Sequence, residues 1–309
     1  MGSLGGFSKK WLSIPFLFLV VVATMPIYVE PYTIVSITSI LMYITLAVSW
    51  AMFCGPTGYI SLAAATFFGV GIYTSAVLAP VLPLPVVVVL GGLLSFLLGL
   101  LVGFISLRLA GFYFAIFTFG LSELIRNSVL WWEHNITFTV GRYIPLVDNL
   151  VVYYYMLAIV LLTVLASHII RSSKFGVALQ SIGECEDAAA HIGINVTAFR
   201  IRFFAISCFF MGMAGAIMAT KWTYIDPNSA FNPILSFTPV LMSLFGGVGQ
   251  IYGPVLGASI LTFISEILLS KFPYHYPLIY GIIFIVVIVF LPGGLVGLVA
   301  KRRKRALQD

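Results

Sequence analysis

Long apolar runs separated by short polar turns make up most of the chain. The runs continue over about 20 residues, the length of an α-helix that crosses a bilayer, and they lack the alternation typical of membrane strands. We therefore predict an all-α fold, a polytopic transmembrane helical bundle forming one domain over residues 1–309, with about ten membrane passes. The predicted passes are 11–29, 32–53, 60–79, 85–107, 111–130, 150–170, 203–220, 234–245, 251–269 and 277–291.

Two places in this pattern predict broken or short helices. Glycine and proline interrupt the chain over 54–58, before the third pass, and a second interruption, Gly246-Gly247-Val248-Gly249, follows the pass at 234–245. That pass is too short to cross untilted at 1.5 Å per residue. Because the interruptions occupy similar places in the two parts of the chain, we predict two related halves. Paired broken helices indicate a substrate path in transporters, and the alternative is that these glycines allow close helix packing.

The longest polar stretch is 171–202, named here the polar segment. Apolar residues within 175–182 recur at three- and four-residue spacing, which predicts a helix with one apolar face. A second short helix is predicted over 184–192, with acidic residues in its first turn, where they favour the helix dipole. Gly193 stands where a left-handed C-terminal cap is expected, and Asn195 is a predicted N-cap for the next helix.

The distribution of Lys and Arg predicts the orientation in the membrane, because cytoplasmic loops carry an excess of these residues. An even number of passes with a cytoplasmic N-terminus gathers most of them on one side. Both termini, the polar segment and a basic tail over 300–309 are then cytoplasmic, and 131–149 and 221–233 are outer loops. The cytoplasmic basic residues would be Lys9, Lys10, Arg108, Arg171, Lys174, Arg200, Arg202 and the cluster 301–305, with Arg142, Lys221 and Lys271 outside.

The composition agrees with a membrane protein and excludes other classes. Hydrophobic residues make up 61% of the chain and charged residues 8%, against roughly a quarter charged in a soluble domain. The net charge of +6 is spread between the passes rather than gathered in one patch, so no nucleic-acid partner is predicted. The apolar run after Lys9 and Lys10 has no clear small-x-small cleavage site, which favours an uncleaved first pass over a signal peptide.

No catalytic or metal-binding constellation is recognisable in the sequence. The three cysteines and four histidines are scattered without ligand spacing. Neither a phosphate-binding loop nor a nucleophile motif is present. We therefore predict that the chain is not an enzyme, and that it holds no metal and no cofactor of its own.

Few charged residues fall inside the predicted passes. Glu123 and Arg126 are three residues apart on one helix face and are predicted to pair, whereas Glu266 stands alone in its pass. A charge inside the bilayer costs about 2.5–3.5 kcal/mol on insertion scales, so each of these groups needs a partner or water. They are interpreted either as parts of a substrate path or as structural groups near the outer interface.

Four sets of motifs follow one another along the chain. They are Gly58-Tyr59-Ile60-Ser61-Leu62 with the glycine-rich run 67–74, the segment 107–115 with Glu123-Leu124-Ile125-Arg126, the polar stretch 175–195, and the glycine-rich runs 246–258 and 292–298. In this order they resemble permease subunits of branched-chain amino acid ABC importers, the LivM-type family, over about residues 47–298. The chain departs from the family's pattern at Tyr59, at Ala63-Ala64 and at Thr139-Val140-Gly141.

The resemblance implies a transport function with defined partners. Such a subunit lies in the cytoplasmic (inner) membrane and forms a path for branched-chain, aliphatic amino acids with a second, homologous permease. Two cytoplasmic ATPases hydrolyse ATP and dock on the polar segment and on the equivalent loop of the second permease, and an extracytoplasmic binding protein delivers the small-molecule substrate. The implied ATPase-coupling residues are Glu184, Glu186, Asp187, Ala188, Ala189 and Gly193. The residues assigned to the substrate path are Gly58, Tyr59, Ser61, Thr118, Glu123, Gly141 and Gly249.

Three alternatives stay open at this point. Related permeases carry urea or short amides, and the departures near the path leave that substrate class in place. An ion-coupled carrier acting alone predicts acids near mid-membrane. A membrane-embedded enzyme predicts clustered His, Asp, Ser or Lys on facing helices, and the sequence offers no convincing set for either.

Overall fold

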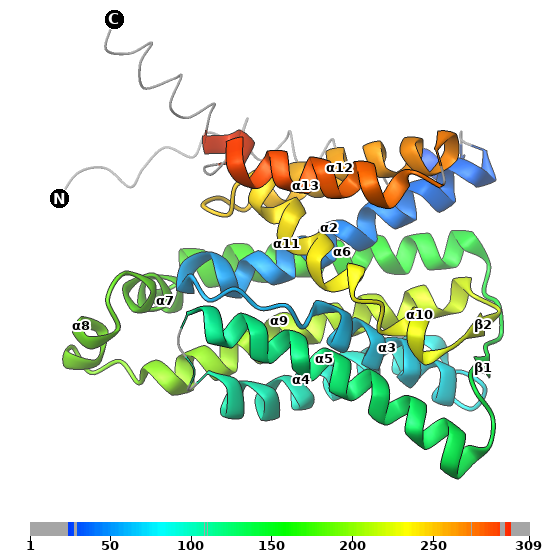
Figure 1. Cartoon of the computed structure of the whole chain (residues 1–309), viewed down its shortest axis with the longest axis horizontal. Helices are drawn as coiled ribbons and strands as arrows, with labels where there is room; N and C mark the ends of the chain where they lie inside the picture. Colours follow the sequence, from blue (N-terminus) through cyan, green and yellow to red (C-terminus); the bar gives the residue numbers. More distant parts are fainter. Residues whose placement is uncertain are drawn as a thin grey trace, which may run out of the picture.

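The computed structural model describes residues 24–27, 30–107, 109, 111–272, 274–290 and 294–297. Over these ranges the chain is a helical bundle with one short antiparallel β ladder (Figure 1). The elements are η1 (Met25–Ile27), α2 (Pro31–Thr57), α3 (Ala64–Leu78), α4 (Leu84–Ser106), α5 (Phe112–Trp132), the π-helical turn η2 (Glu133–Thr137), β1 (Arg142–Tyr143), α6 (Asn149–Ser172), α7 (Lys174–Glu184), α8 (Glu186–His191), α9 (Val196–Met218), η3 (Ala219–Lys221), β2 (Tyr224–Ile225), α10 (Pro227–Ala230), α11 (Ile234–Gly246), α12 (Tyr252–Lys271) and α13 (Tyr276–Phe290).

The helical prediction is confirmed for the described residues, whereas about ten passes and two related halves stay predictions. The predicted first pass lies outside the described residues apart from 24–27, and the tail 300–309 lies outside them entirely. Helices α3 and α13 are apolar but have only 15 residues each. Six described stretches are long and apolar enough to cross a membrane: Pro31–Thr57, Leu84–Ser106, Asn149–Ser172, Val196–Lys221, Pro227–Gly246 and Tyr252–Lys271.

Helix α9 is at the centre of the bundle, in contact with α2, α3, α4 and α6. Within Val196–Lys221, which contains α9, 89% of an 18-residue apolar stretch is buried inside the bundle. Close approach is possible because glycines face one another across these helices. Gly71 of α3 lies against the backbone at Gly212, and Gly91 of α4 lies 2.8 Å, measured from an ideal Cβ, from the Ala216 methyl group. Small residues of this kind let helix backbones pack closely inside a bilayer.

The predicted interruption at 54–58 is wrong in its position. Helix α2 continues through Gly55 and Pro56 to Thr57, and the non-helical stretch is 58–63. Pro56 falls in the last turn, where its missing N–H removes a single backbone hydrogen bond. The helix then ends at Gly58, whose φ of 72° is left-handed and whose N–H donates to the Cys54 carbonyl.

The start of α8 also differs from the prediction, whereas the start of α9 agrees with its predicted N-cap. Helix α9 begins at Val196, directly after the predicted N-cap Asn195, whose side-chain oxygen accepts a hydrogen bond from the Ala198 N–H at 3.1 Å. It therefore begins before the predicted membrane pass 203–220. Helix α8 begins at Glu186 rather than 184, because Cys185 is extended and separates it from α7. Asn195 is confirmed as an N-cap, and Gly193 has the expected left-handed φ of 86°.

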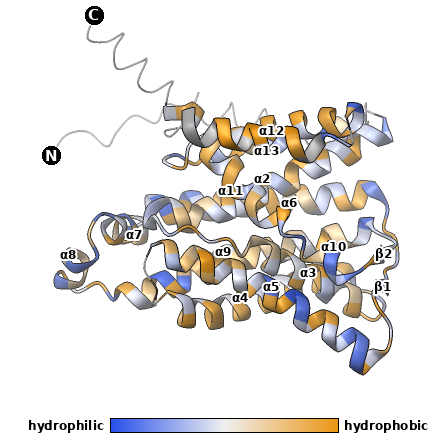
Figure 2. Cartoon of the chain, viewed as in Figure 1, coloured by the Kyte–Doolittle hydropathy of each residue, from blue (hydrophilic) through white to orange (hydrophobic). Residues whose placement is uncertain are grey.

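The two ends of the bundle carry different structures (Figure 1). Helices α7 and α8 form one end, and the β ladder, in which Arg142 pairs with Ile225 and Tyr143 with Tyr224, forms the other. Hydrophilic residues gather at α8 and near the end of α5, whereas the helices between them are largely hydrophobic (Figure 2). The predicted outer loops 131–149 and 221–233 therefore meet at the end opposite the polar segment.

Candidate functional site

Helices α7 and α8 are fixed to the bundle on one side and exposed on the other. The hydroxyl of Ser173 caps α7 by accepting the Phe175 N–H at 3.2 Å. Leu179 and Ile182 bury the apolar face of α7, and Gly183 lies directly against the Pro56 carbonyl at the end of α2. A side chain at Gly183 would collide with that carbonyl, so glycine is what allows α7 to pack on α2.

The predicted coupling residues divide between these two environments. Glu184, Asp187 and Ala188 are exposed on the surface of the bundle end. Ala189 is 1% exposed and belongs to the packing of α8. The Glu184 carboxylate accepts a hydrogen bond from Gln180 at 3.2 Å, within its own helix. Glu184, Asp187 and Ala188 are therefore available to a partner protein, whereas Ala189 supports α8 from beneath.

Glu186 has contacts that the sequence did not indicate. Its carboxylate forms an ion pair with Arg200 of α9, and it accepts a hydrogen bond from the Tyr59 hydroxyl at 2.8 Å. The Arg200 guanidinium also lies over the Tyr59 ring, with its carbon 4.2 Å from the ring centroid. Burial alone would raise the pKa of Glu186, but the hydrogen bonds from Arg200 and Tyr59 hold that pKa below its ordinary value.

Tyr59 thus lies at the polar segment, although we assigned it to the substrate path. It belongs to the stretch 58–63 that separates α2 from α3. Its ring packs edge-on against Phe114 of α5, with centroids 5.6 Å apart. The Tyr59–Glu186–Arg200 cluster therefore joins the stretch 58–63 to α8 and α9.

Arg171, at the start of the polar segment, holds the second interruption. Its guanidinium donates to the carbonyl oxygens of Val248 and Gly249 at 3.0 and 3.1 Å, and to that of Ala51 in α2 at 3.3 Å. The Val248 and Gly249 carbonyls lie in the turn between α11 and α12, where backbone acceptors have no helical partner. Arg171 therefore ties the glycine-rich turn after α11 to α2.

A cavity of about 490 Å³ opens beside Arg171. It brings together Gly58 and Gly249, which we assigned to the path, with Glu184, which we assigned to coupling. Binding sites for small molecules commonly have volumes of about 300–1,000 Å³. The cavity is therefore large enough for an amino acid. Its lining is Gly55, Pro56, Gly58, Ile170, Arg171, Gly176, Leu179, Gln180, Gly183, Glu184, Val248 and Gly249.

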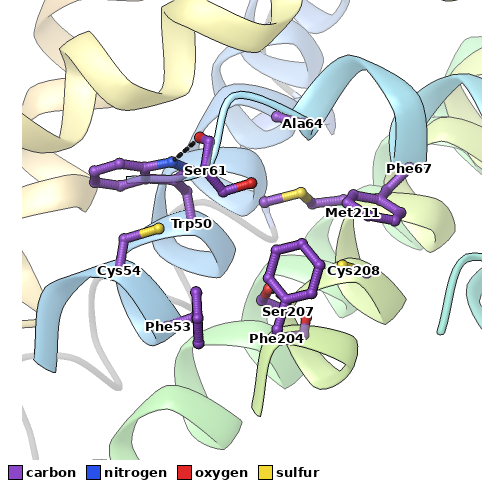
Figure 3. A pocket seen from close by; sticks show the side chains of 10 residues that line it. All are labelled: Trp50, Phe53, Cys54, Ser61, Ala64, Phe67, Phe204, Ser207, Cys208 and Met211. Atoms are coloured by element: carbon purple, nitrogen blue, oxygen red, sulfur yellow. Dashed lines mark hydrogen bonds between the residues drawn. The ribbon is translucent and has the colours of Figure 1, made fainter. Parts of the chain in front are cut away.

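The stretch 58–63 is held in place by hydrogen bonds from neighbouring helices. The Trp50 indole N–H donates to the Ser61 carbonyl at 2.8 Å, a contact drawn in Figure 3. The Thr118 hydroxyl accepts the Leu62 N–H at 3.0 Å. Backbone groups that leave the helical pattern inside a bundle need such partners. Ser61 and Thr118, two predicted path residues, therefore meet at this stretch.

The cavity behind the stretch 58–63 is small. Side chains of α2, α3 and α9 converge on it, among them Cys54, Phe67 and Ser207 (Figure 3). Its volume of about 10 Å³ is room for about one water molecule. An amino acid does not fit there in this conformation, so passage along this side of α9 would require the helices to move.

The remaining predicted path residues lie away from the polar segment. Glu123 and Arg126 form the predicted ion pair at 2.6 Å, and both side chains are about one quarter exposed (29% and 24%). Gly141 has a left-handed φ of 80° and its N–H donates to the Glu133 carboxylate at 2.8 Å. The structure therefore brings Gly58, Tyr59, Ser61 and Thr118 together near one end, but places Gly141 at the β ladder.

Sequence reasoning missed Arg171, Arg200 and Glu133 as structural centres. The two arginines were used only as markers of orientation, and no local spacing connects either one to its distant partners. Glu133 is 2% exposed and lies 3.9 Å from Arg142 across the loop after α5. The feature of the sequence that could have indicated Glu133 is a carboxylate beside Trp131-Trp132 with a basic residue, Arg142, in the loop that follows.

Long apolar helices, an internal interruption and a solvent-exposed helix pair at one end are typical of a multi-pass membrane transport protein. The family model "Branched-chain amino acid transport system / permease component" matches residues 32–291, and the chain belongs to this family of ABC-type permeases. The permease component of an ABC system works with further components such as an ATPase and a binding protein. The predicted class of protein is therefore confirmed.

Named relatives support this assignment. The chain is 26% identical to the high-affinity branched-chain amino acid transport system permease protein LivM of Salmonella typhimurium strain LT2, over 90% of this chain and 73% of that protein. LivM of Escherichia coli K12 gives the same identity and coverage. The xylose transport system permease protein XylH of Haemophilus influenzae is 31% identical over 34% of this chain and 29% of that protein. No solved structure matches.

Proposed function

We propose that this chain is the membrane-spanning permease subunit of an ABC importer for branched-chain, aliphatic amino acids. It forms the translocation path with a second, homologous permease, and it receives substrate from an extracytoplasmic binding protein at the β-ladder end. The observation that carries the proposal is the short, capped and exposed helix α8, which is tied through Glu186 and Arg200 to the central helix. A rigid element of this kind is suited to receive a push from a partner and pass it to the bundle.

In this arrangement, both termini and the polar segment are cytoplasmic. Two ATPases dock, one on α7 and α8 of this chain and the other on the equivalent segment of the second permease. Glu184, Asp187 and Ala188 are the exposed contacts of this chain, and Gly193 is the cap that ends α8. The partners bind and hydrolyse ATP, and this chain holds no cofactor of its own. Closing of the ATPase pair displaces α8, and the helices then rock between outward- and inward-facing states.

The substrate class is supported by the family and by the LivM relatives. The 490 Å³ cavity beside Gly58 and Gly249 is the proposed inner end of the path, since it lies between the two interruptions. Short amides or urea are the second candidate, and the departures from the family at Tyr59 and Ala63 favour keeping it. An ion-coupled carrier has less support, because Glu123 is neutralised by Arg126.

The docking proposal is tested at Ala188, an exposed small residue of α8. The chain is co-expressed with its ATPase subunits, and their co-purification is measured for Ala188→Asp and for the matched control Ala188→Ser. We expect the aspartate to reduce co-purification and the serine to preserve it, because only the aspartate adds a charge that would be desolvated in an interface. Equal recovery of ATPase with both variants would remove α8 as the docking helix.

The transport proposal is tested in proteoliposomes that contain the full complex and the binding protein. ATP-dependent uptake of labelled leucine, isoleucine or valine is compared with uptake of urea and acetamide. Uptake of aliphatic amino acids that requires ATP is the expected result. Uptake by this chain without ATPase subunits would refute the ABC assignment, and uptake of urea alone would replace the substrate.

A further inference from the structure

Glu186 differs from its acidic neighbours in where its carboxylate points. Glu184 and Asp187 are exposed, whereas the Glu186 carboxylate turns inward to Arg200 and to the Tyr59 hydroxyl. The Arg200 side chain is 5% exposed, and that of Glu186 is 46% exposed. The buried partner is therefore the arginine of the central helix, and the carboxylate reaches it from the rim.

Tyr59 connects the same cluster to the interior. It follows the left-handed Gly58, which ends α2, and two residues later the Ser61 carbonyl is held by Trp50. The Tyr59 ring packs on Phe114, and Phe114 packs on Phe204 of α9 with centroids 6.0 Å apart. A continuous set of contacts thus leads from α8 to the small cavity shown in Figure 3.

We propose that Tyr59, Glu186 and Arg200 are positioning residues that transmit the displacement of α8 to the stretch 58–63, and so set the number of substrate molecules transported per ATP hydrolysed. This inference rests on the proposed function of the chain as an ABC importer subunit. It assigns Glu186 to the chain's own transmission rather than to binding of the ATPase.

The physical reason for joint movement is that displacement of Glu186 alone would break its ion pair with the buried Arg200. If α8 moved alone, the guanidinium would stay buried with neither its carboxylate partner nor access to water, an arrangement that proteins avoid strongly. The cation–π contact with Tyr59 and the hydrogen bond from its hydroxyl then favour movement of α8, Arg200 and Tyr59 as one unit. Since Tyr59 lies in a stretch without helical hydrogen bonds, the motion passes into backbone that is held by side chains of neighbouring helices rather than by a helix of its own.

Glu186→Gln and Tyr59→Phe test the inference in the reconstituted complex of permease, ATPases and binding protein. The glutamine keeps an oxygen acceptor for Arg200 but removes the charge, and the phenylalanine keeps the ring but removes the hydroxyl. Glu30→Gln is the matched control, because it is the same change at an exposed carboxylate that lies outside the polar segment and makes no side-chain cap at the start of α2. Three quantities are measured for each: ATPase co-purification, ATP hydrolysis and substrate uptake per ATP.

We expect Glu186→Gln and Tyr59→Phe to retain the ATPase subunits and hydrolysis, but to lower uptake per ATP by roughly twofold to thirtyfold, the range by which mutations along a physical network change coupling. The double variant should lose no more than the more severe single variant, because both changes break the same transmission. Glu30→Gln should keep the wild-type ratio.

Three results would overturn the inference. One is an unchanged ratio in both single variants, and another is additive losses in the double variant. The third is loss of ATPase co-purification in Glu186→Gln, which would make that carboxylate a docking contact. Failure of the proposed function itself would be distinguishable, because then the wild-type chain would neither retain ATPases nor transport in an ATP-dependent way.

Discussion

The close packing of α3 on α9 leads to a quantitative prediction about Gly71. A Cβ placed on this residue would lie 2.9 Å from the Ala216 backbone nitrogen and closer still to the Gly212 carbonyl oxygen. Both neighbours are backbone atoms of the central helix, so neither can turn away as a flexible side chain would. Replacement by alanine therefore requires the two helices to separate.

The size of the effect follows from two opposing contributions. Overpacking of a close contact costs about 1–3 kcal/mol, and a rigid backbone neighbour places this case near the upper end. Replacing glycine by alanine within a helix returns about 0.5–1 kcal/mol. We expect Gly71→Ala to destabilise the protein by about 2 kcal/mol.

Gly120 supplies the matched control, since it lies within α5 and an added Cβ would meet nothing within 4 Å. Gly120→Ala should be neutral or stabilising by up to about 1 kcal/mol. Thermal unfolding of the two variants in the same detergent, followed by fluorescence-detected size-exclusion chromatography, measures the difference. A Gly71→Ala protein as heat-stable as Gly120→Ala would refute the close approach of α3 and α9.

Three further predictions concern the charged groups. Arg171→Gln should reduce the free energy of unfolding by about 1.5–3 kcal/mol or more, because charge-assisted hydrogen bonds to three carbonyls are lost, whereas the exposed Arg202→Gln should change thermal stability little. The contribution of the ionised Glu186 to the free energy of unfolding should be fully present above its unfolded pKa of about 4.5, and it should be lost as the pH falls through the lower pKa of the folded protein. The unfolding temperatures of the wild type and of Glu186→Gln should therefore differ between pH 5 and 8 and converge in acid. Glu133→Gln should weaken the contact with Arg142 and make the loop after α5 more sensitive to limited proteolysis than in the wild type.

Local patterns in the sequence were sufficient to predict the helices and several of their caps. Asn195 and Gly193 were predicted because capping depends on residues within one helical turn of each other. The end of α2 was misplaced because Gly55 and Pro56 resemble a helix break, yet a proline in the last turn costs little. Helix α9 begins before the predicted pass 203–220 because its first turns carry Arg200 and Arg202, which do not belong to an apolar run, whereas Asn195 marked the start of the helix correctly.

The candidate site was harder to predict because its contacts join residues far apart in the chain. Tyr59 and Glu186 are separated by 127 positions, and Arg171 and Gly249 by 78. Hydrophobic periodicity assigns such residues to a helix or an interruption, but it contains no information on which ends of which helices meet. Arg171 and Arg200 were therefore treated as orientation markers, although Arg171 donates to three backbone carbonyls and Arg200 contacts the Glu186 carboxylate and the Tyr59 ring.

These long-range contacts also change how the two predicted sets of residues relate to each other. The polar segment and the substrate path were treated as separate parts, one at the surface and one inside. Glu186 reaches the interruption at 58–63 through Tyr59, and Arg171 reaches the interruption after α11 through Val248. The polar segment thus contacts both non-helical stretches, one through Glu186 and the other through Arg171. A force applied to α8 would act on backbone that lacks helical hydrogen bonds, which deforms at lower cost than an intact helix. The interruptions are therefore the places where motion of the polar segment would enter the bundle.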